Sequence, residues 1–308
     1  HGGTFGAMAA SGTGARKTPF EPHMAGFPKV FPPNYYRDRF SSWEECNRFC
    51  ARMFEDVIVH EDPDTVAGVI LEPVSNTGGV ITPTDEYFQI IREICDRYEV
   101  LLIYDEIITA YGKTGQMFGA QTFGVTPDII CGGKSLSSGI LPLGAMMARE
   151  DMGEVFLGPP EDNLNFAHGH TYAGNPLGCA TGIAVIEEIL KGDLAARARQ
   201  LGDYLAQKLE ELRKYEVVRE VRGKGLLRGV ELCRDTASMA PFPELGNALK
   251  KTALQNGLIM RVDPTWFALS PALIASEADV DEMCSLIEKS LVDALDLTCK
   301  GGGVTPNS

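Results

Sequence analysis

The chain of 308 residues carries a formal net charge of −14 at pH 7, and 44% of its residues are apolar while 8% are aromatic. This composition is typical of a soluble globular protein with one large or two ordinary domains. The acidic balance argues against nucleic acid and anionic membranes as partners, because both require basic patches. No segment stays apolar over the ~18 residues that a membrane-spanning helix needs, so no membrane partner is expected.

The start of the chain and its cysteines indicate where the protein works. No signal peptide opens the sequence, and the first residue is His1 rather than Met, which indicates a fragment. Eight cysteines are scattered through apolar segments without a CxxC pair, and only five histidines are present. We therefore expect no zinc or other metal site. Buried thiols in a reducing compartment predict a cytoplasmic protein.

The first sixty residues contain a loop and a helix. Residues 1–40 are rich in Gly and Pro and show little periodicity, which predicts an irregular loop. The next segment, 41–60, has apolar residues at helical spacing. Ser42 stands near its start with Glu45 three residues later, an arrangement typical of a capping box. A helix is therefore expected over 41–60.

A strand–helix–strand pattern follows. Apolar runs predict strands over 66–71 and 100–104, and helical spacing predicts a helix over 84–98 between them. Such a βαβ unit is almost always a right-handed parallel crossover. Another short run, 128–131, is apolar after Asp128 and is typical of a third strand buried on both faces of a parallel sheet. A further short strand over 144–149 could run antiparallel to these.

The second half of the chain changes in character. We expect helices over 175–190, 192–214, 241–255 and 276–295, and short strands over 217–221, 226–232, 258–262 and 267–269. The sequence therefore predicts a large domain over 1–200, a smaller C-terminal α+β domain over 201–299 and a disordered tail over 300–308.

Polar side chains follow the predicted parallel strands, namely Glu72, Asp105 and Lys134. The carboxyl ends of parallel strands meet at one edge of a sheet, and ligands bind beyond this edge. We therefore expect these three side chains to converge. A carboxylate and a lysine at two strand ends, with Gly132 and Gly133 beside the lysine, fit pyridoxal phosphate. Its aldehyde forms a Schiff base with the amine, and the acid pairs with the pyridinium nitrogen.

Each of these residues also has an ordinary interpretation when it is considered alone. Lys134 could be a surface lysine on a loop, and Asp105 could cap a helix. A phosphate loop ending in Gly-Lys-Ser would need glycine at position 128, where Asp128 stands, and no G-x-G-x-x-G follows a strand. The combination of Asp105 and Lys134, each after a buried strand, favours the cofactor site.

Three stretches resemble a known family. They are DEIITAYGKTG (105–115), PDIICGGKSLSSGILPLGA (127–145) and HGHTYAGNPLGCA (168–180), in family order. They are similar to the class III aminotransferases of the ω-amino acid:pyruvate type, which are fold-type I enzymes dependent on pyridoxal 5'-phosphate. The resemblance implies an α/β fold with a large, mostly parallel sheet and a smaller C-terminal domain. Family members extend further before this point, so it also implies an N-terminally truncated chain that binds the cofactor weakly or not at all on its own.

The resemblance implies roles for four residues at the cofactor. Lys134 would carry the internal aldimine and then move the proton between the substrate carbon and the cofactor. Asp105 would keep the ring nitrogen protonated, and Ile107 would pack on the ring face. Thr171 would bind the cofactor phosphate of the neighbouring subunit, which implies a homodimer. A helix-capping hydroxyl is the alternative for Thr171.

The resemblance also implies two substrate-binding residues. Arg261 resembles the arginine that receives a substrate carboxylate, although a solvated arginine at a strand end is the alternative. Glu72 resembles a glutamate that covers a second arginine in ornithine- and GABA-type members. That arginine would fall near Ala268, so the same role is not expected here. Ile108 stands where many members have glutamine and mildly favours the branch that uses pyruvate.

The expected reaction is a ping-pong transfer of an amino group from an ω-amino acid or amine to a 2-oxo acid, with pyruvate as the favoured acceptor. A pyridoxal-phosphate-dependent aminomutase or decarboxylase shares Lys134 and Asp105 and is the first alternative. A non-catalytic truncated product is the second alternative. Dependence of turnover on an amino acceptor would separate the transaminase from the mutase and the decarboxylase.

Overall fold

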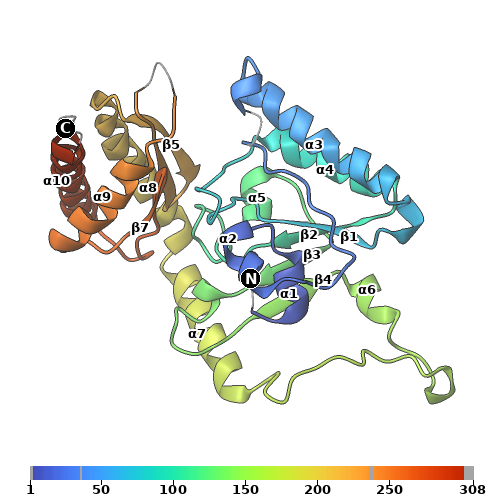
Figure 1. The fold of residues 1–308 in the computed structure, drawn as a ribbon. Coiled ribbons are helices and arrows are strands. Elements are labelled where there is room, and N and C mark those ends of the chain that lie inside the picture. The colour runs from blue at the N-terminus through green and yellow to red at the C-terminus, as the bar shows by residue number, and fades with distance from the viewer. Residues whose placement is uncertain (1–2, 35–36, 236–238, 302–308) are drawn as a thin grey trace. The chain divides into compact units, whose positions relative to one another are not determined.

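The computed structural model describes residues 3–34, 37–235 and 239–301, which fold into two units (Figure 1). Unit 1 consists of His1–Val74, Pro83–Tyr111 and Gln116–Asp193, and unit 2 consists of Ser75–Thr82, Gly112–Gly115 and Leu194–Ser308. Unit 2 therefore takes two short segments from the first half of the chain. Among the residues that the structure describes, no helix is both long enough and apolar enough to cross a membrane.

Unit 1 is built on a four-stranded sheet. Its strands lie in the order β1 (Gly68–Leu71), β2 (Leu101–Asp105), β3 (Ile129–Gly132) and β4 (Ala145–Ala148). The first three strands are parallel, and β4 pairs with β3 in the antiparallel direction. The predicted βαβ unit and the antiparallel last strand are thus confirmed.

Two long helices, α3 (Trp43–His60) and α4 (Asp85–Arg97), pack side by side in unit 1 (Figure 1). The hydroxyl of Ser42 accepts a hydrogen bond from the backbone N–H of Glu45 at 3.1 Å, so the predicted start of α3 is confirmed. The hydroxyl of Thr84 caps α4 in the same way. The remaining helices of unit 1 are α1 (Phe5–Ala10), α2 (Gly14–Lys17), α5 (Gly119–Phe123), α6 (Glu150–Glu154) and α7 (Pro176–Lys191).

The prediction of an irregular loop over 1–40 is wrong for two short stretches, because α1 and α2 lie within it. Helix α1 has the sequence FGAMAA, and alanine has the highest helix propensity of the residues. Thr4 precedes it in an extended conformation, and its side chain makes no capping hydrogen bond. The frequency of Gly and Pro over the whole segment concealed this local preference.

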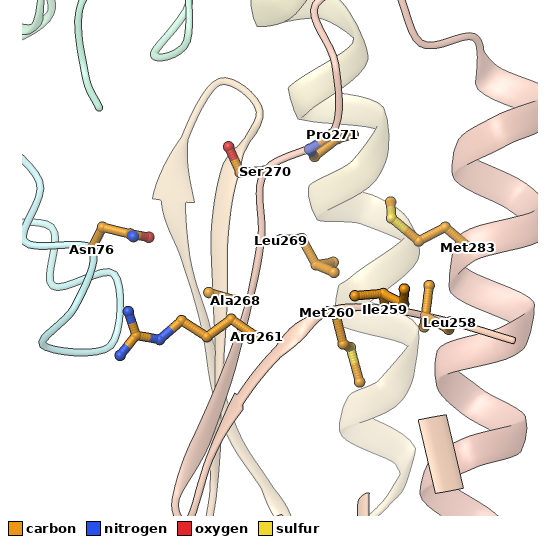
Figure 2. A pocket seen from close by; sticks show the side chains of 10 residues that line it. All are labelled: Asn76, Leu258, Ile259, Met260, Arg261, Ala268, Leu269, Ser270, Pro271 and Met283. Carbon is orange, nitrogen blue, oxygen red and sulfur yellow. The ribbon is translucent and has the colours of Figure 1, made fainter. Parts of the chain in front are cut away.

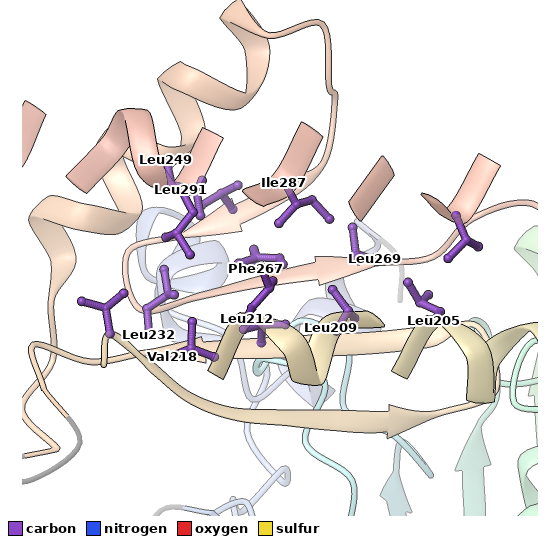
Figure 3. Packing of buried hydrophobic residues seen from close by; sticks show 14 of the residues in the cluster. Leu205, Leu209, Leu212, Val218, Leu232, Leu249, Phe267, Leu269, Ile287 and Leu291 are labelled. Atoms are coloured by element: carbon purple, nitrogen blue, oxygen red, sulfur yellow. The ribbon is translucent and has the colours of Figure 1, made fainter. Parts of the chain in front are cut away.

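Unit 2 has a second, antiparallel sheet. Its strands lie in the order β5 (Val218–Lys224), β6 (Leu227–Leu232), β8 (Trp266–Leu269) and β7 (Arg261–Asp263). Helices α8 (Leu194–Glu210), α9 (Pro243–Gln255) and α10 (Glu277–Gly301) supply apolar side chains that pack with those of the strands (Figure 3). Each leucine buried there contributes about 1.5–3 kcal/mol relative to an exposed one.

Several boundaries in unit 2 differ from the prediction, and strand β5, for example, runs to Lys224 and not to position 221. Helix α8 gives way to a 3₁₀ turn over Glu211–Lys214 instead of continuing as one helix. Strand β7 begins only at Arg261, because the backbone N–H of Leu258 still donates to the carbonyl of Ala253 at the end of α9. Helix α10 continues to Gly301, so the described part of the predicted tail is helical, and residues 302–308 lie outside the described residues.

The two short segments of unit 2 are attached by side-chain and backbone hydrogen bonds and by one close approach between backbones. The Nε of Arg222 donates to the carbonyl of Gly79 at 2.8 Å, and the Nζ of Lys113 donates to the carbonyl of Pro271 at 2.8 Å. The backbone N–H of Leu226 donates to the carbonyl of Lys113 at 3.0 Å. Gly225 makes this approach possible, since a Cβ there would lie 2.5 Å from the carbonyl carbon of Thr114.

Gly225→Ala should therefore destabilise unit 2 by about 3 kcal/mol, because the methyl group meets backbone atoms and the φ of +54° disfavours a side chain. Gly257→Ala is the matched control. Its φ is +84° but no atom lies within 4 Å of the new methyl, so only backbone strain of about 1 kcal/mol is expected. Denaturant unfolding of both variants measures the difference, and equal losses would contradict this account.

Lys113 should make the stability of unit 2 depend on pH. Its side chain is buried, and burial lowers the pKa of Lys113 to about 8, whereas an unfolded lysine has a pKa of about 10.4. Between these two pH values the unfolded state holds a proton that the folded state has released, so the free energy of unfolding should rise with pH.

Lys113→Met should remove this rise, while Lys191→Met, which changes an exposed lysine, should keep it. The measurement is the free energy of unfolding in urea at about pH 8 and about pH 10.4, compared between each variant and the unsubstituted protein. If the Lys113→Met protein gains as much stability over this range as the unsubstituted protein, Lys113 is not the responsible group.

Candidate active site

Asp105 and Lys134 lie at the ends of neighbouring parallel strands. Asp105 is the last residue of β2, and its register partner on β3 is Cys131. Lys134 lies three residues after Cys131, follows Gly132 and Gly133, and begins a 3₁₀ turn. The structure thus brings the predicted carboxylate and the predicted amine to the same edge of the sheet.

The backbone of Lys134 is strained. Its φ of +43° lies in the left-handed region, which costs a non-glycine residue about 1–2 kcal/mol. The surrounding turn enforces this conformation, because the N–H of Leu136 donates to the carbonyl of Gly133 at 3.0 Å and the N–H of Ser137 donates to that of Lys134 at 3.2 Å. Strain of this kind concentrates at functional sites, and here it fixes where the lysine side chain leaves the backbone.

The carboxylate of Asp105 is held by the residues that follow it. Its Oδ1 accepts a hydrogen bond from the N–H of Ile107 at 3.1 Å. The N–H of Glu106 donates to the carbonyl of Cys131 at 2.9 Å, which continues the pairing with β3 past the end of β2. Ile107 itself lies against Gly133, where an added Cβ would be 2.9 Å from its Cδ1. An apolar side chain is therefore placed beside the carboxylate and the lysine.

Glu106 is a residue of this site that the sequence reasoning missed. It is fully buried, and its carboxylate accepts hydrogen bonds from the N–H of Gly119 at 2.5 Å, the N–H of Ala120 at 2.8 Å and the hydroxyl of Thr109 at 3.0 Å. Burial raises the pKa of Glu106, although these donors act in the opposite direction.

A signal for Glu106 existed in the sequence. The N-cap position of α5 is Phe118, whose side chain cannot accept a hydrogen bond, so the first N–H groups of that helix need an acceptor from elsewhere. A carboxylate directly after a buried strand is a candidate for this role. Glu106 thereby ties the segment after Asp105 to α5.

Glu72 and Thr171 lie in different surroundings. Glu72 follows β1, whose last residue Leu71 is paired with Tyr104, so it leaves the same end of the sheet as Asp105. Thr171 is exposed and precedes α7. The alternative that Thr171 caps this helix is wrong, because the Oδ1 of Asn175 accepts from the first N–H groups of α7.

Arg261 belongs to unit 2, whereas the residues described above belong to unit 1. It lines a pocket of 270 Å³ together with Asn76, Ala268 and Ser270 (Figure 2). Its side chain is 32% exposed and pairs with the carboxylate of Asp263, so it is neither buried nor fully solvated.

A family model for class-III aminotransferases matches residues 1–291, and the chain belongs to this family. The chain is 36% identical over 300 residues to the taurine–pyruvate aminotransferase of Bilophila wadsworthia (strain 3_1_6), with 94% of this chain and 66% of that protein covered. It is 36% identical over 302 residues to a probable aminotransferase of Mycobacterium tuberculosis (strain ATCC 25618 / H37Rv), with 95% and 64% covered. The chain thus spans about two thirds of the length of these relatives.

Solved structures agree with this assignment. A thermostable (S)-enantioselective ω-transaminase from Thermomicrobium roseum aligns with a TM-score of 0.90 at 36% identity, covering 96% of this chain and 66% of that chain. The ω-transaminase from Pseudomonas jessenii in complex with PMP aligns with a TM-score of 0.92 at 32% identity, covering 98% and 68%. Class-III aminotransferases and these neighbours depend on pyridoxal 5'-phosphate, so the predicted family, fold class and cofactor are confirmed.

Glu106→Gln should destabilise unit 1 by about 2 kcal/mol, because the amide NH₂ would face a backbone N–H that now has a carboxylate oxygen as its acceptor. Glu93→Gln, on the exposed face of α4, is the matched control and should change the free energy of unfolding little. Denaturant unfolding provides the comparison. A Glu106→Gln protein as stable as the control variant would show that the three hydrogen bonds contribute nothing net.

Proposed function

We propose that the protein transfers an amino group from an ω-amino acid or amine to a 2-oxo acid, with pyruvate as the acceptor. The observation that carries this proposal is the placement of Asp105 and Lys134 at neighbouring strand ends in a class-III aminotransferase chain. The names of the relatives support the substrate class, since one acts on taurine and pyruvate and the structural neighbours are ω-transaminases.

The chemistry of the residues at this edge fits pyridoxal 5'-phosphate. Lys134 offers a primary amine, Asp105 a carboxylate held by the N–H of Ile107, and Ile107 an apolar surface beside Gly133. When bound, the cofactor supplies an electron sink that accepts negative charge from the substrate carbon. We propose that these three residues hold it, with Asp105 at the ring nitrogen and Ile107 on the ring face.

Each residue then has a physical task. Asp105 holds a proton at the ring nitrogen, because a carboxylate favours the charged form of a neighbouring base. Lys134 accepts the proton from the substrate carbon and returns it one position along, which is general base and acid catalysis by one amine. Its strained turn fixes the direction in which its side chain leaves the backbone. Ile107 keeps water from one side of the reacting carbon.

Two further residues complete the proposal. Arg261 binds the carboxylate of the substrate through its planar guanidinium. Thr171, on an exposed segment, binds the cofactor phosphate of a neighbouring subunit, so the active protein is a homodimer. Glu72 leaves the sheet at the same edge and contributes to substrate binding in this proposal.

Lys134→Ala should lower the rate of alanine formation from pyruvate by roughly a thousandfold or more, because the proton-transfer group is lost. The assay supplies pyridoxal 5'-phosphate and β-alanine or taurine as the donor, and it measures alanine in time. Lys191→Ala, which changes an exposed lysine on α7, should leave the rate unchanged. Loss of activity in both variants would contradict a specific role for Lys134.

The same assay separates the alternatives. A transaminase consumes more than one equivalent of amino donor per active site only when a 2-oxo acid is present, whereas an aminomutase or a decarboxylase does not need one. Repeated turnover of the donor without any 2-oxo acid would overturn the proposed reaction and favour one of these two enzymes. Absence of turnover with every donor and acceptor would favour a non-catalytic protein.

A further inference from the structure

Two glycines directly before Lys134 leave space that two side chains fill. A Cβ on Gly132 would lie 2.4 Å from the Oη of Tyr111, and a Cβ on Gly133 would lie 2.9 Å from the Cδ1 of Ile107. Successive residues of extended backbone point to opposite faces, so Tyr111 and Ile107 approach the chain from opposite sides. The strand end that leads to Lys134 is therefore held between two side chains of the segment that follows β2.

Tyr111 has an unusual backbone conformation for a bulky residue. Its φ of +60° lies in the left-handed region, which bulky side chains rarely adopt. Its N–H donates to the carbonyl of Met117 at 2.6 Å, and its ring packs against that of Phe118 with 5.8 Å between the ring centres. The neighbouring chain thus enforces a conformation that tyrosine avoids, and strain of this kind concentrates at functional sites.

The ring of Tyr111 has little freedom to move away from Gly132. The residue is only 3% exposed. Besides the Oη, the Cε2 and Cζ of the ring would lie 3.2 Å from a Cβ on Gly132. A hydroxyl at the end of a flexible side chain could turn aside, whereas this one is attached to a buried ring on an enforced backbone. The Oη therefore limits how far the backbone at Gly132 can approach.

The position of Gly132 determines where the turn at Lys134 starts. Gly132 is the last residue of β3, and only Gly133 separates it from the 3₁₀ turn that begins at Lys134. The N–H of Leu136 donates to the carbonyl of Gly133 at 3.0 Å, which ties the turn to this glycine. A displacement at Gly132 would thus be transmitted through Gly133 to the backbone of Lys134.

We propose that Tyr111 is a positioning residue whose hydroxyl, lying against Gly132, fixes the end of β3 and with it the strained turn at Lys134. This inference deepens the proposed function and rests on it, because Lys134 is the amine that the proposal assigns to the cofactor. An ordinary aromatic residue of the core is the alternative, and in that case the hydroxyl has no effect on the turn.

A pair of substitutions isolates the contact between the hydroxyl and Gly132. Gly132→Ala adds a methyl group where the Oη of Tyr111 lies, so it should displace the strand end. Tyr111→Phe removes this oxygen and leaves ring carbons 3.2 Å from the new methyl group, a contact that a small shift relieves. The double variant should therefore recover most of what Gly132→Ala loses. Gly144→Ala is the matched control, because the nearest atom to its methyl group, the carbonyl oxygen of Gly132, lies 3.7 Å away.

Hydrogen exchange in the full chain without cofactor reports on the turn directly. The N–H groups of Leu136 and Ser137 are hydrogen-bonded within it. The peptide that contains them should exchange roughly tenfold faster in Gly132→Ala, a coupling of the size that residues in contact show. The double variant should return to within about threefold of the unsubstituted protein. Gly144→Ala should leave this exchange unchanged, and peptides from α3 should keep their rates in every variant.

Two results of this experiment would overturn the inference. Exchange in the turn that stays as fast in the double variant as in Gly132→Ala would show that the hydroxyl does not set the strand end. Equal acceleration in α3 would show a general loss of stability instead of a displaced turn. If Gly132→Ala does not fold, the double variant must fold, and its failure would contradict the inference as well.

A second measurement asks whether the lysine follows the turn. Each variant is titrated with pyridoxal 5'-phosphate and reduced with borohydride, and peptide mapping gives the concentration that half-saturates the label on Lys134. This concentration should rise roughly tenfold in Gly132→Ala and return in the double variant. Unchanged labelling in Gly132→Ala, despite faster exchange in the turn, would overturn the claim that Tyr111 positions Lys134.

The outcomes keep this inference distinct from the proposed function. Recovery of exchange and labelling in the double variant, in a protein that transfers no amino group to pyruvate, would support the positioning role and overturn the proposed function. Amino transfer without this recovery would leave the proposed function standing and overturn the positioning role. Absence of label on Lys134 in the unsubstituted protein would overturn both, because the cofactor would then use another amine.

Discussion

The candidate active site depends on the parallel pairing of β2 with β3. Because Asp105 and Cys131 are register partners, the carboxylate and the segment that carries Lys134 leave the sheet together. A shift of one residue in this pairing would turn every side chain of the shifted strand to the other face of the sheet. Backbone hydrogen bonds therefore set the separation of the two backbone segments that carry the acid and the amine, and the strained turn sets the direction in which the Lys134 side chain leaves the backbone.

Buried carboxylates hold both ends of this strand pair. At one end Asp128 accepts from the N–H of Leu102 at 2.7 Å and from Arg92 at 2.9 Å. Burial acts to raise the pKa of Asp128, but the hydrogen bonds from Leu102 and Arg92 outweigh it and keep this pKa below the usual range. At the other end Glu106 accepts three hydrogen bonds and has a raised pKa. Removing one partner from such a buried group costs folding free energy, so these hydrogen bonds stabilise the geometry of the site.

Local patterns in the sequence predicted most of the scaffold. The apolar runs before Asp105 and Lys134 and the capping serine at Ser42 each depend on neighbouring residues, and the structure confirms them. Local patterns did not predict contacts between residues that are distant in sequence. Glu106 serves the N–H groups of a helix that begins at Gly119, and the segments 75–82 and 112–115 join a unit formed mainly by residues after 193. The periodicity of apolar residues carries no information about such contacts. A single predicted boundary between two domains does not reveal them either.

The most direct test of the central claim is reductive trapping. The protein is saturated with pyridoxal 5'-phosphate, treated with borohydride to make the bond to lysine permanent, and digested for peptide mapping. The account predicts that the label lies on Lys134 and that Asp105→Asn lowers the amount trapped there. A label concentrated on another lysine, or spread evenly over exposed lysines such as Lys191, would contradict the assignment of the strand ends at Asp105 and Lys134 as the cofactor site.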